Sequence, residues 1–443
     1  MCGIWAFLGP GANNYVVKLA PWLIHRGQEG VSYVCRVDKS LIKLSNASAI
    51  SSTLCLGHAR YSTSGPYGIE LQPIVLNNDF ALVFNGTISN YMELVIRLKR
   101  DFGINIKTNY DALALAYYMR ELLSKWGIDD GINELFRTLR GGYSIIAVWR
   151  DLLIVIRDPW GFRPLVIGSN GSGIAIASES AALETLGMAW REVEPGKALV
   201  LHGSGKEYWV EGPRVRRAYC ALEYIYFLRP DSYFNGISVY EVRRRLGMAL
   251  ARKEAIRDID LVAPIPETAR IAAEAYASSI GKSVHEVVIK NRYVGRGFIK
   301  PPSERSMDMY SVVRDAVRGM SIALVDDSII RGDTLRKVLP KLRASGARAV
   351  HVRVSSPPIR YPCFMGMDFP TRRELIAHGK SIDDVRKLLG ADSLVYLTVN
   401  ELTSSIGMTE LCTACFTGDY PFNIDIENAE KLFMSDRVWE SQE

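Results

Sequence analysis

The sequence predicts two domains of different fold class, a layered α+β domain followed by a doubly wound α/β domain. The chain has 443 residues, which is enough for two or three domains with large buried cores. Up to about residue 215 it reads as short strands broken by glycine and polar turns, with few helices between them. Beyond that point helical stretches alternate with apolar strands. The predicted domains therefore span residues 2–215 and 216–443.

The first domain is expected to consist mainly of sheets. Its predicted strands cover residues 32–38, 81–90, 143–151, 152–158 and 173–180. The clearest helix is ALALAYYMRELLSKWG, residues 112–127, which carries apolar side chains at helical spacing. Several short strands with sparse helices are typical of layered sheets.

The second domain is expected to hold a mostly parallel sheet. Its predicted helices cover residues 238–256, 267–281 and 334–347, and its predicted strands cover residues 261–266, 284–289, 321–327 and 349–356. A loop rich in Arg, Gly and Pro occupies residues 291–305. Alternating strands and helices with apolar, β-branched strands are the pattern of a doubly wound fold.

The composition narrows the class of function. The hydrophobic share of 48% and the mean hydropathy of +0.03 are those of ordinary soluble globular proteins. The net charge of +6 suits phosphorylated substrates, but it is too diffuse to indicate nucleic-acid binding. We see no membrane-spanning stretch and no signal-peptide pattern. Seven cysteines are few for this length and fit a reducing cytoplasm better than a disulfide framework.

The stretch SIALVDDSIIRGDTLRKVLPKL predicts a phosphate site. An apolar strand ends in Asp326 and Asp327, and the loop 328–334 leads directly into a helix. Such a loop presents free backbone N–H groups and the positive end of the helix dipole to a phosphate. The paired carboxylates would then hold hydroxyls or a magnesium ion. The alternative is a solvated strand end with a helix cap. A Walker A loop is excluded, because the stretch lacks its Lys followed by Ser or Thr.

VDDSIIRGDT closely resembles the 5-phosphoribosyl-1-pyrophosphate (PRPP) motif of type I phosphoribosyltransferases. The resemblance implies that Asp326 and Asp327 hold the ribose hydroxyls and Mg²⁺ with PRPP. It implies that the 5′-phosphate is bound by Ser328, Ile329, Ile330, Arg331, Gly332, Asp333 and Thr334. EYIYFLRPDSYFNGISVYEVRRRLG, IKNRYVGRGFI and HVRVSSPPIRYPCFMGMD resemble further segments of the glutamine PRPP amidotransferase family, in the same order. That likeness implies a flexible loop that carries Lys290, Arg292, Tyr293 and Arg296 and closes over PRPP.

The chain departs from this family at a few positions. Asp333 and Gly297 each stand where the family usually has Thr, and PETAR replaces the common PDSG on the pyrophosphate side. An inward-pointing Asp333 would repel the 5′-phosphate, whereas an outward-pointing one would leave the phosphate site intact. Ala112 replaces a common Glu beside Asp111.

The N-terminus, MCGIW, predicts a source of ammonia. Loss of Met1 would leave Cys2 with a free α-amine, whose reference pKa near 8 lets it share a proton with the thiol. Arg60 in GHARYSTSG is a candidate partner for the α-carboxylate of glutamine, and Asp111 could hold its ammonium group. Asn85 and Gly86 in FNGTISN offer an amide and a backbone N–H of the kind that forms an oxyanion hole.

With HRGQEG, RDPWGFRPL and ASESAAL, these motifs resemble the class II (N-terminal nucleophile) glutaminase domain, which has an αββα sandwich. The likeness assigns Cys2 as nucleophile, Asn85 with Gly86 as oxyanion hole, and Arg60 and Asp111 as glutamine-binding residues, to which we add Arg26. Taken singly, each motif has a simpler explanation, such as a turn at Asn-Gly or a helix cap at Asp111.

The remaining cysteines divide into two groups. Cys35 and Cys55 lie in apolar, strand-like runs and are expected in the core. AYCALEY, YPCFMGMD and LCTACFTGDYP resemble the cysteine sites of the iron–sulfur type of the amidotransferase family. The likeness implies a structural [4Fe–4S] cluster on Cys220, Cys363, Cys412 and Cys415. The alternative is four unrelated buried thiols.

The resemblance implies a cytoplasmic glycosyltransferase that makes 5-phosphoribosylamine, glutamate and pyrophosphate from PRPP, glutamine and water, the first committed step of purine synthesis. It further implies Mg²⁺, inhibition by purine nucleotides and a homo-oligomer, with no nucleic-acid or membrane partner. One alternative is a catalytically weakened paralogue that binds nucleotides as a regulator. A glutaminase coupled to another acceptor is disfavoured, because the second half carries the PRPP motif.

Overall fold

The computed structural model describes residues 1–61, 72–107, 110–203, 205–291 and 309–435. The chain folds into two compact units. The first unit contains residues 1–220, 363–370 and 421–443, and the second contains residues 221–362 and 371–420. The first long run ends close to the predicted boundary at residue 215. The two later runs of the first unit lie within the segment that the sequence assigns to the second domain.

The first unit is built around two antiparallel sheets. One sheet follows the order β11 (Ala189–Glu192), β9 (Val166–Asn170), β10 (Gly173–Ala177), β1 (Gly3–Leu8), β4 (Leu54–Ala59), β2 (Val31–Val37) and β3 (Ser40–Leu44). The other follows the order β13 (Glu207–Glu211), β12 (Lys197–His202), β8 (Leu152–Arg157), β7 (Gly141–Trp149), β6 (Phe80–Ile88) and β5 (Ile74–Leu76). The short strand β14 (Tyr219–Cys220) closes the first run of the unit.

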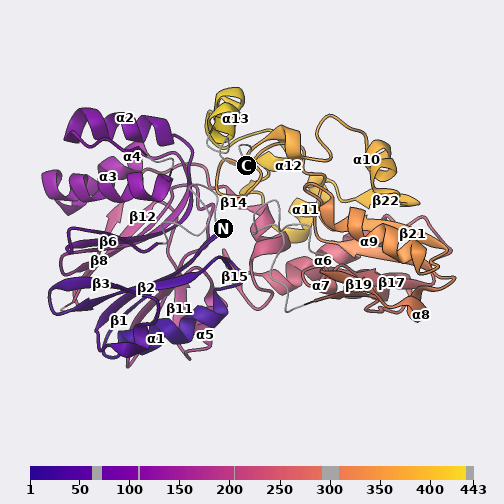
Figure 1. Ribbon diagram of the computed structural model, residues 1–443, viewed down its shortest axis with the longest axis horizontal. Helices are drawn as coiled ribbons and strands as arrows, with labels where there is room; N and C mark the ends of the chain where they lie inside the picture. Colours follow the sequence, from indigo (N-terminus) through magenta and orange to yellow (C-terminus); the bar gives the residue numbers. More distant parts are fainter. Residues whose placement is uncertain (62–71, 108–109, 204, 292–308, 436–443) are drawn as a thin grey trace. The chain divides into compact units, whose positions relative to one another are not determined.

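Helices cover the outer faces of both sheets, which gives the four layers visible in Figure 1. The covering helices are α1 (Ala12–Leu19), α2 (Tyr91–Phe102), α3 (Asp111–Trp126), α4 (Ile128–Thr138) and α5 (Ser180–Glu184), and the unit also contains α13 (Ile426–Ser435). Side chains on α3 and α4 share a core with β6 and β7, and side chains on α1 and α5 share a core with β1 and β10. The predicted αββα sandwich is therefore confirmed.

A third core fills the space between the two sheets. Along β6, Phe80, Leu82 and Phe84 pack toward the helices. Ala81 and Val83 point the other way, into the layer between the sheets. This alternation follows from the two-residue period of a strand, and the register between β6 and β7 is continuous. Asn85, two residues after Val83, therefore lies on the face between the sheets.

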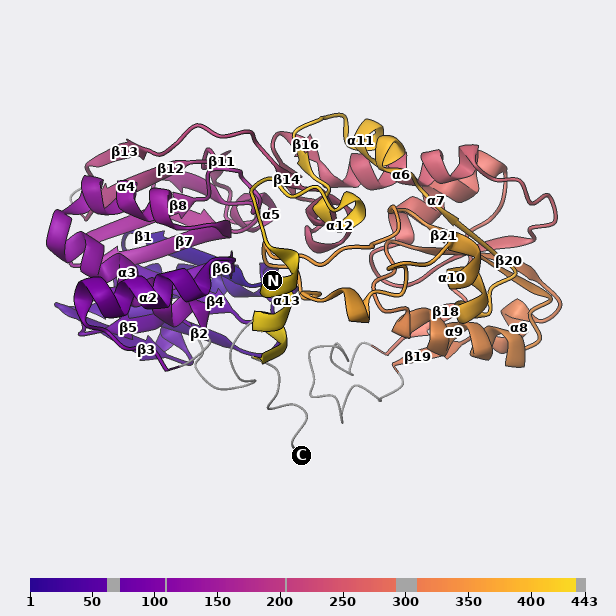
Figure 2. The same cartoon turned by 90° about the horizontal axis from the view of Figure 1, so that it is seen from above.

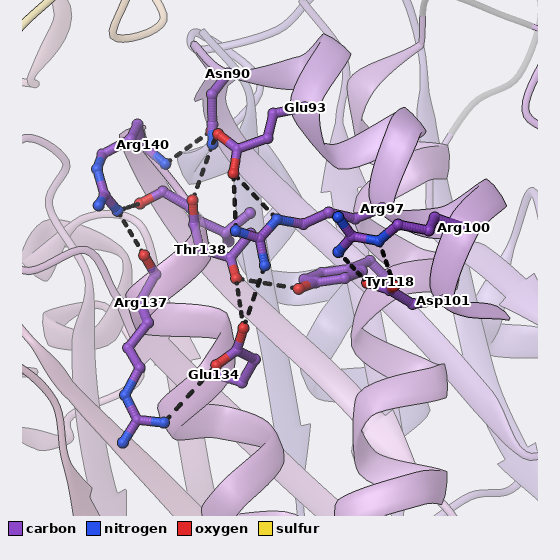
Figure 3. A network of polar contacts seen from close by, with 11 residues as sticks. Asn90, Glu93, Arg97, Arg100, Asp101, Tyr118, Glu134, Arg137, Thr138 and Arg140 are labelled. Carbon is purple, nitrogen blue, oxygen red and sulfur yellow. Dashed lines mark hydrogen bonds and ion pairs between the residues drawn. The ribbon is translucent and has the colours of Figure 1, made fainter.

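A polar network joins the outer helices to the end of β6 (Figure 3). The side chain of Asn90 donates to the carbonyl oxygen of Thr138 at 2.9 Å and accepts from the backbone N–H of Arg140 at 2.9 Å. On the surface of the same layer, Arg97 pairs with Glu93 at 2.9 Å and with Glu134 at 3.4 Å. The network fixes the turn after β6 against the segment that leads into β7.

The second unit is built around a parallel sheet in the order β17 (Leu261–Pro264), β20 (Ser321–Asp326), β21 (Ala349–Val354) and β22 (Ser393–Tyr396). Its helices are α6 (Val239–Arg252), α7 (Arg270–Ile280), α8 (Arg314–Val317), α9 (Asp333–Ala344), α10 (Ile382–Leu389), α11 (Val399–Ile406) and α12 (Ala414–Thr417). Short strands complete it: β15 (Tyr233–Phe234), β16 (Ile237–Ser238), β18 (Val288–Lys290), β19 (Tyr310–Val312) and β23 (Leu411–Cys412).

The parallel sheet is wound in both directions from β17. After α7 the chain returns beside β17, where Val284 forms a parallel bridge to Val262. After β20 it proceeds the other way through α9, β21 and α10 to β22. Because such crossovers are right-handed, α7 and α9 must cover opposite faces of the sheet, as Figure 2 shows. The predicted doubly wound fold is confirmed.

Two local predictions need correction. The predicted strand 284–289 is divided: Val284 forms only an isolated bridge, and β18 begins at Val288 and pairs antiparallel with β19. The sequence also predicted reduced cysteines, whereas the structure joins Cys35 and Cys55 in a disulfide. Both cysteines lie in the core as expected, and the register of β2 and β4 places them directly opposite each other. Only the strand pairing reveals that proximity.

Candidate active site

Cys2 lies just before β1. Its Sγ donates a hydrogen bond to the carbonyl oxygen of Tyr61 at 3.5 Å. Burial raises the pKa of the Cys2 thiol, and the N-terminal amine opposes that shift when it is protonated. In the full chain Met1 is 2% exposed, and burial lowers the pKa of its amine to about 4. An amine with a pKa this low is neutral at physiological pH and can accept a proton.

Arg26 contacts the main chain of Cys2 and the side chain of Glu179. Its Nε donates to the carbonyl oxygen of Cys2 at 3.3 Å, and its NH1 group lies 2.6 Å from Oε1 of Glu179. His25 approaches the same Glu179 oxygen at 2.7 Å. Arg26 and Glu179 are fully buried. The predicted glutamine-binding residue Arg26 is thus placed to hold the main chain of Cys2.

Arg60 follows β4 and is held in place by an acid. Its Nε donates to Oε2 of Glu29 at 3.2 Å, and both side chains are almost fully buried. Its guanidinium lies 5.3 Å from the ring centroid of Tyr110. Burial raises the pKa of Tyr110, and the charges of Arg60, Cys2 and Asp111 all act on it. The structure therefore brings three predicted site residues together around one tyrosine.

Asp111 begins α3 and is 5% exposed. Its Oδ2 accepts a hydrogen bond from the backbone N–H of Ile88 at 3.1 Å, at the end of β6. The carboxylate therefore ties the start of α3 to the strand that carries Asn85 and Gly86. Its charge acts on Tyr110 and raises the pKa of that hydroxyl, whereas the charge of Arg60 lowers it.

Asn85 and Gly86 have the features of an oxyanion hole. Asn85 is fully buried, and neither its amide nitrogen nor its amide oxygen has a hydrogen-bond partner among the residues that the structure describes. A buried amide without partners costs free energy unless a ligand satisfies it. Gly86 has a φ of 152°, and a Cβ there would lie 1.8 Å from the carbonyl oxygen of Gly142. Only glycine fits this position, because the backbone of Gly142 fills the space that a side chain would need.

His58 is a site residue that the sequence reasoning missed. It lies on β4 two residues after Leu56, on the face between the sheets, and pairs in register with Ile4 of β1. It is fully buried, and within the described part of the chain neither ring nitrogen has a hydrogen-bond partner. Burial lowers its pKa well below the usual value, and the charge of Arg60 lowers it further. The ring is therefore neutral.

The second unit carries the paired carboxylates at the carboxyl end of β20. Asp326 and Asp327 are 6% and 8% exposed, and the backbone N–H of Asp327 donates to Oδ1 of Asp326 at 2.9 Å. Burial raises the pKa of Asp326 well above its usual value, and the neighbouring Asp327 carboxylate raises it further. Ser328 Oγ donates to Oδ2 of Asp327 at 2.7 Å. Two buried carboxylates of like charge favour a bound cation.

In the loop 328–334 that follows Asp327, several residues contact other parts of the second unit. Ile329 is buried in the core of the unit, and the carbonyl of Ile330 accepts from the N–H of Ile376 at 2.9 Å. Arg331 forms an ion pair with Glu374. Gly332 has a φ of 83° and precedes the helix α9. Side chains here anchor the loop, which leaves backbone N–H groups as the candidate phosphate donors.

Asp333, the main departure from the family pattern, is the first residue of α9, and it is exposed. An acid in the first turn of a helix interacts favourably with the dipole. Thr334 follows and is half-buried.

Pro266, Glu267 and Arg270 of PETAR line a cavity of about 500 Å³ in the second unit. Its lining includes Glu267, Arg270, Glu286 and Lys290. Arg270 lies 3.2 Å from Oε2 of Glu267 and 3.0 Å from Oε1 of Glu286. Arg270 is therefore shared between two acids, and its buried Nε has no partner in the described ranges. Of the predicted flexible loop, Lys290 ends β18, whereas Arg292, Tyr293, Arg296 and Gly297 lie outside the described residues.

Comparison with known proteins identifies the family. A model described as "Glutamine amidotransferase domain" matches residues 58–185. A protein of Pyrococcus horikoshii named amidophosphoribosyltransferase is 40% identical over 441 residues, which cover 95% of this chain and 96% of that protein. The chain belongs to the amidophosphoribosyltransferase family. A relative of the same name from Methanocaldococcus jannaschii is 36% identical over 96% of this chain and 99% of its own length.

Solved structures agree with the assignment to the amidophosphoribosyltransferase family. The glutamine PRPP amidotransferase of Bacillus subtilis, complexed with ADP and GMP, matches with a TM-score of 0.85 and 36% identity. The match covers 96% of this chain and 98% of the B. subtilis chain. A structure described as the allosteric regulatory enzyme of purine biosynthesis matches with a TM-score of 0.86. Membership makes the chain a glutamine amidotransferase and phosphoribosyltransferase enzyme.

The four cysteines expected to carry a cluster are thiols, and each is 8% exposed. Cys412 ends β23, and Cys415 lies in α12. Cys363 Sγ accepts a hydrogen bond from the backbone N–H of Met365 at 3.4 Å. Within the described ranges, no three His, Cys, Asp or Glu side chains are grouped so that they could hold a metal ion. The iron–sulfur type of this family therefore stays a prediction.

In the part of the chain that the structure describes, no helix has the length and apolar character needed to cross a membrane.

Proposed function

We propose that this chain makes 5-phosphoribosylamine from PRPP with nitrogen taken from glutamine, and that glutamate and pyrophosphate are the other products. This reaction is the first committed step of purine synthesis. The observation that carries the proposal is the 40% identity to a named amidophosphoribosyltransferase over 95% of the chain. Each unit also holds a site suited to one half of the reaction.

In the glutaminase half, the thiolate of Cys2 attacks the amide carbon of glutamine, so that an S–C bond forms and ammonia leaves with the proton of the thiol. The α-amine of Cys2, freed by loss of Met1, carries that proton. The amide of Asn85 and the backbone N–H of Gly86 stabilise the oxyanion. The burial of Asn85 without partners supports this role. Water then releases glutamate from the thioester.

Arg60 and Asp111 bind the α-carboxylate and the α-ammonium group of glutamine. The ion pair between Arg60 and Glu29 supports the first role, because it fixes the guanidinium before the ligand arrives. Arg26 supports the nucleophile, because it donates a hydrogen bond to the carbonyl oxygen of Cys2.

In the transferase half, Asp326 and Asp327 hold the ribose, and the backbone of residues 328–334 holds the 5′-phosphate. Ammonia attacks C1 as pyrophosphate leaves. The buried carboxylate pair fits Mg²⁺, which would neutralise charge on the departing pyrophosphate when bound with PRPP. The loop with Lys290, Arg292, Tyr293 and Arg296 would exclude water from the reaction.

We also propose a structural [4Fe–4S] cluster on Cys220, Cys363, Cys412 and Cys415. Four buried thiols, a Cys-x-x-Cys pair and the N–H donated to Cys363 Sγ support this ligand set. Analysis of iron and acid-labile sulfide in anaerobically purified protein tests it. About four of each per chain are expected for a [4Fe–4S] cluster. Protein that contains zinc alone would refute the cluster.

We further propose that purine nucleotides inhibit the enzyme and that it works as a cytoplasmic homo-oligomer. The B. subtilis structure with ADP and GMP supports nucleotide binding in the family. Inhibition assays with purine nucleotides and light scattering of the purified protein test these two proposals.

A substrate assay with both nitrogen sources tests the proposed function. Cys2→Ser should abolish phosphoribosylamine formation from glutamine and spare its formation from ammonium. Asp327→Asn should lower both activities, because both nitrogen sources meet the same PRPP. If wild-type protein made no phosphoribosylamine even in excess ammonium, the chain would be the nucleotide-binding regulator instead.

A further inference from the structure

The segment Cys363–Pro370, although it comes late in the sequence, is a buried part of the first unit. The carbonyl of Phe364 accepts from Ser89 Oγ at 2.6 Å, just after β6. The carbonyl of Met365 accepts from Nε of Arg163 at 3.0 Å, and Arg163 is fully buried. These contacts fix the segment beside the strand that carries Asn85 and Gly86.

The segment touches the backbone of the oxyanion hole directly. Gly366 has a φ of 107°, and a Cβ there would lie 3.2 Å from Cα of Gly86 and 2.9 Å from Arg163. At Gly142, next to the residue that pairs with Gly86, a Cβ would lie 2.7 Å from the carbonyl oxygen of Met365. Glycines on both sides permit this close approach. The position of the segment therefore sets the space around Gly86.

Asp368, near the end of the segment, reaches the nucleophile through Tyr61. The hydroxyl of Tyr61 donates to Oδ2 of Asp368 at 3.4 Å. The carbonyl of the same Tyr61 accepts from Sγ of Cys2 at 3.5 Å. The Asp368 carboxylate also raises the pKa of the N-terminal amine, whereas the charge of Arg26 lowers it.

We propose that Cys363–Pro370 is part of the glutaminase site, where Asp368 is a positioning residue that orients Cys2 through Tyr61. The inference rests on the proposed glutaminase half-reaction. The segment contributes no atom to bond making. At one end it fixes the backbone at Gly86. At the other end it fixes Tyr61, whose carbonyl oxygen accepts the hydrogen bond from the Cys2 thiol.

Asp368→Asn tests this role, because it removes the charge and keeps the size. Loss of a charged hydrogen-bond acceptor should lower kcat with glutamine about tenfold, with little change in the KM for glutamine. Activity with ammonium should be unchanged, which also shows that the variant is folded. The exposed Asp38→Asn, the same change in the turn between β2 and β3, should leave both activities at the wild-type level.

Two further measurements distinguish a role of Asp368 in orienting Cys2 from a general effect on the fold. The rate of Cys2 alkylation by iodoacetamide against pH should differ between wild type and Asp368→Asn, since the environment of the thiol changes. Tyr61→Phe should give a similar loss, and the double variant should lose no more than either single variant. Additive losses, or alkylation identical to wild type, would overturn the proposal. Alkylation needs no substrate, so this outcome is distinct from a failure of the glutaminase assignment.

Discussion

Arg26 donates a hydrogen bond from Nε to the main-chain carbonyl oxygen of Cys2, with 3.3 Å between the two atoms. It also contacts the buried carboxylate of Glu179 at 2.6 Å. The guanidinium of Arg26 thus links Cys2 to the buried carboxylate of Glu179. Both contacts can form at once because the planar guanidinium carries several N–H donors that point in different directions.

Arg26→Lys should therefore lower kcat with glutamine about a hundredfold, because lysine cannot make both contacts and a small displacement of the nucleophile is costly. The charge remains to pair with Glu179, so the fold should survive. Steady-state kinetics with glutamine and with ammonium check the prediction. The exposed Arg137→Lys is the matched control. Equal losses with the two nitrogen sources would contradict a role specific to Cys2.

Asn85→Leu should separate activity from stability. The variant loses an oxyanion donor, so kcat with glutamine should fall about 10²- to 10³-fold. Because the amide has no partner in the fold, its replacement by an apolar side chain of similar size should leave the free energy of unfolding unchanged or raise it. Kinetics and urea unfolding measure the two effects.

Asn13→Leu is the control for this variant. Asn13 is also buried, but its side chain accepts from the backbone N–H of Ser52 at 3.3 Å and donates to Asn14 at 3.2 Å. Its loss should destabilise the protein by about 1–3 kcal/mol while activity is kept. A similar destabilisation in both variants would show that Asn85 has a structural partner.

The neutral ring of His58 should make stability depend on pH. Its folded-state pKa lies well below the usual value of 6.5, so below pH 6.5 the unfolded chain binds a proton that the folded chain does not. Stability should then fall as the pH drops through this range, by up to about 1.4 kcal/mol per pH unit. The difference in unfolding free energy between wild type and His58→Gln should vary with pH below about 6.5 and be constant above it. His285→Gln, at an exposed position, should show no such dependence.

The layers of the fold could be predicted because they follow from periodicity. The side chains of Leu82 and Val83 point into different cores, and this alternation predicts a strand that lies between two layers. In the second unit, the apolar run of β20 followed by the helical pattern of α9 predicts a strand that leads into a helix. The residues that support the nucleophile could not be predicted in this way. Asp368 lies 307 positions from Tyr61, and no local pattern connects them. Glu29 and Glu179 likewise acquire their roles only when the strands bring Arg60 and Arg26 to them.

Asp333→Thr, which restores the common family residue, should change the KM for PRPP by less than about twofold. Asp333 is exposed at the start of α9, where its charge favours the helix by about 0.3–1 kcal/mol. Removing it should therefore lower stability slightly. The KM for PRPP in the ammonium-dependent reaction is the measurement. A large drop in that KM would show that the carboxylate repels the 5′-phosphate.

Arg270→Ala should weaken PRPP binding, because the carboxylates of Glu267 and Glu286 would then lack their cationic partner. Arg270 neutralises Glu267 and Glu286 at the wall of the cavity, and without it two carboxylates would face an anionic ligand. The KM for PRPP should rise about tenfold at low salt and less at high salt, because the repulsion is screened. Adding Glu286→Gln to Arg270→Ala should recover part of the loss, since one of the two charges is removed.

Arg244→Ala is the control for Arg270→Ala, because Arg244 forms a comparable pair with Glu241 on the exposed face of α6, at 3.1 Å. Its loss should leave the KM for PRPP unchanged, since exposed pairs of this kind contribute little. An equal rise in KM for both variants would point to a loss of overall positive charge rather than to the cavity. If Glu286→Gln gave no recovery, Arg270 would contact PRPP itself instead of screening the two acids.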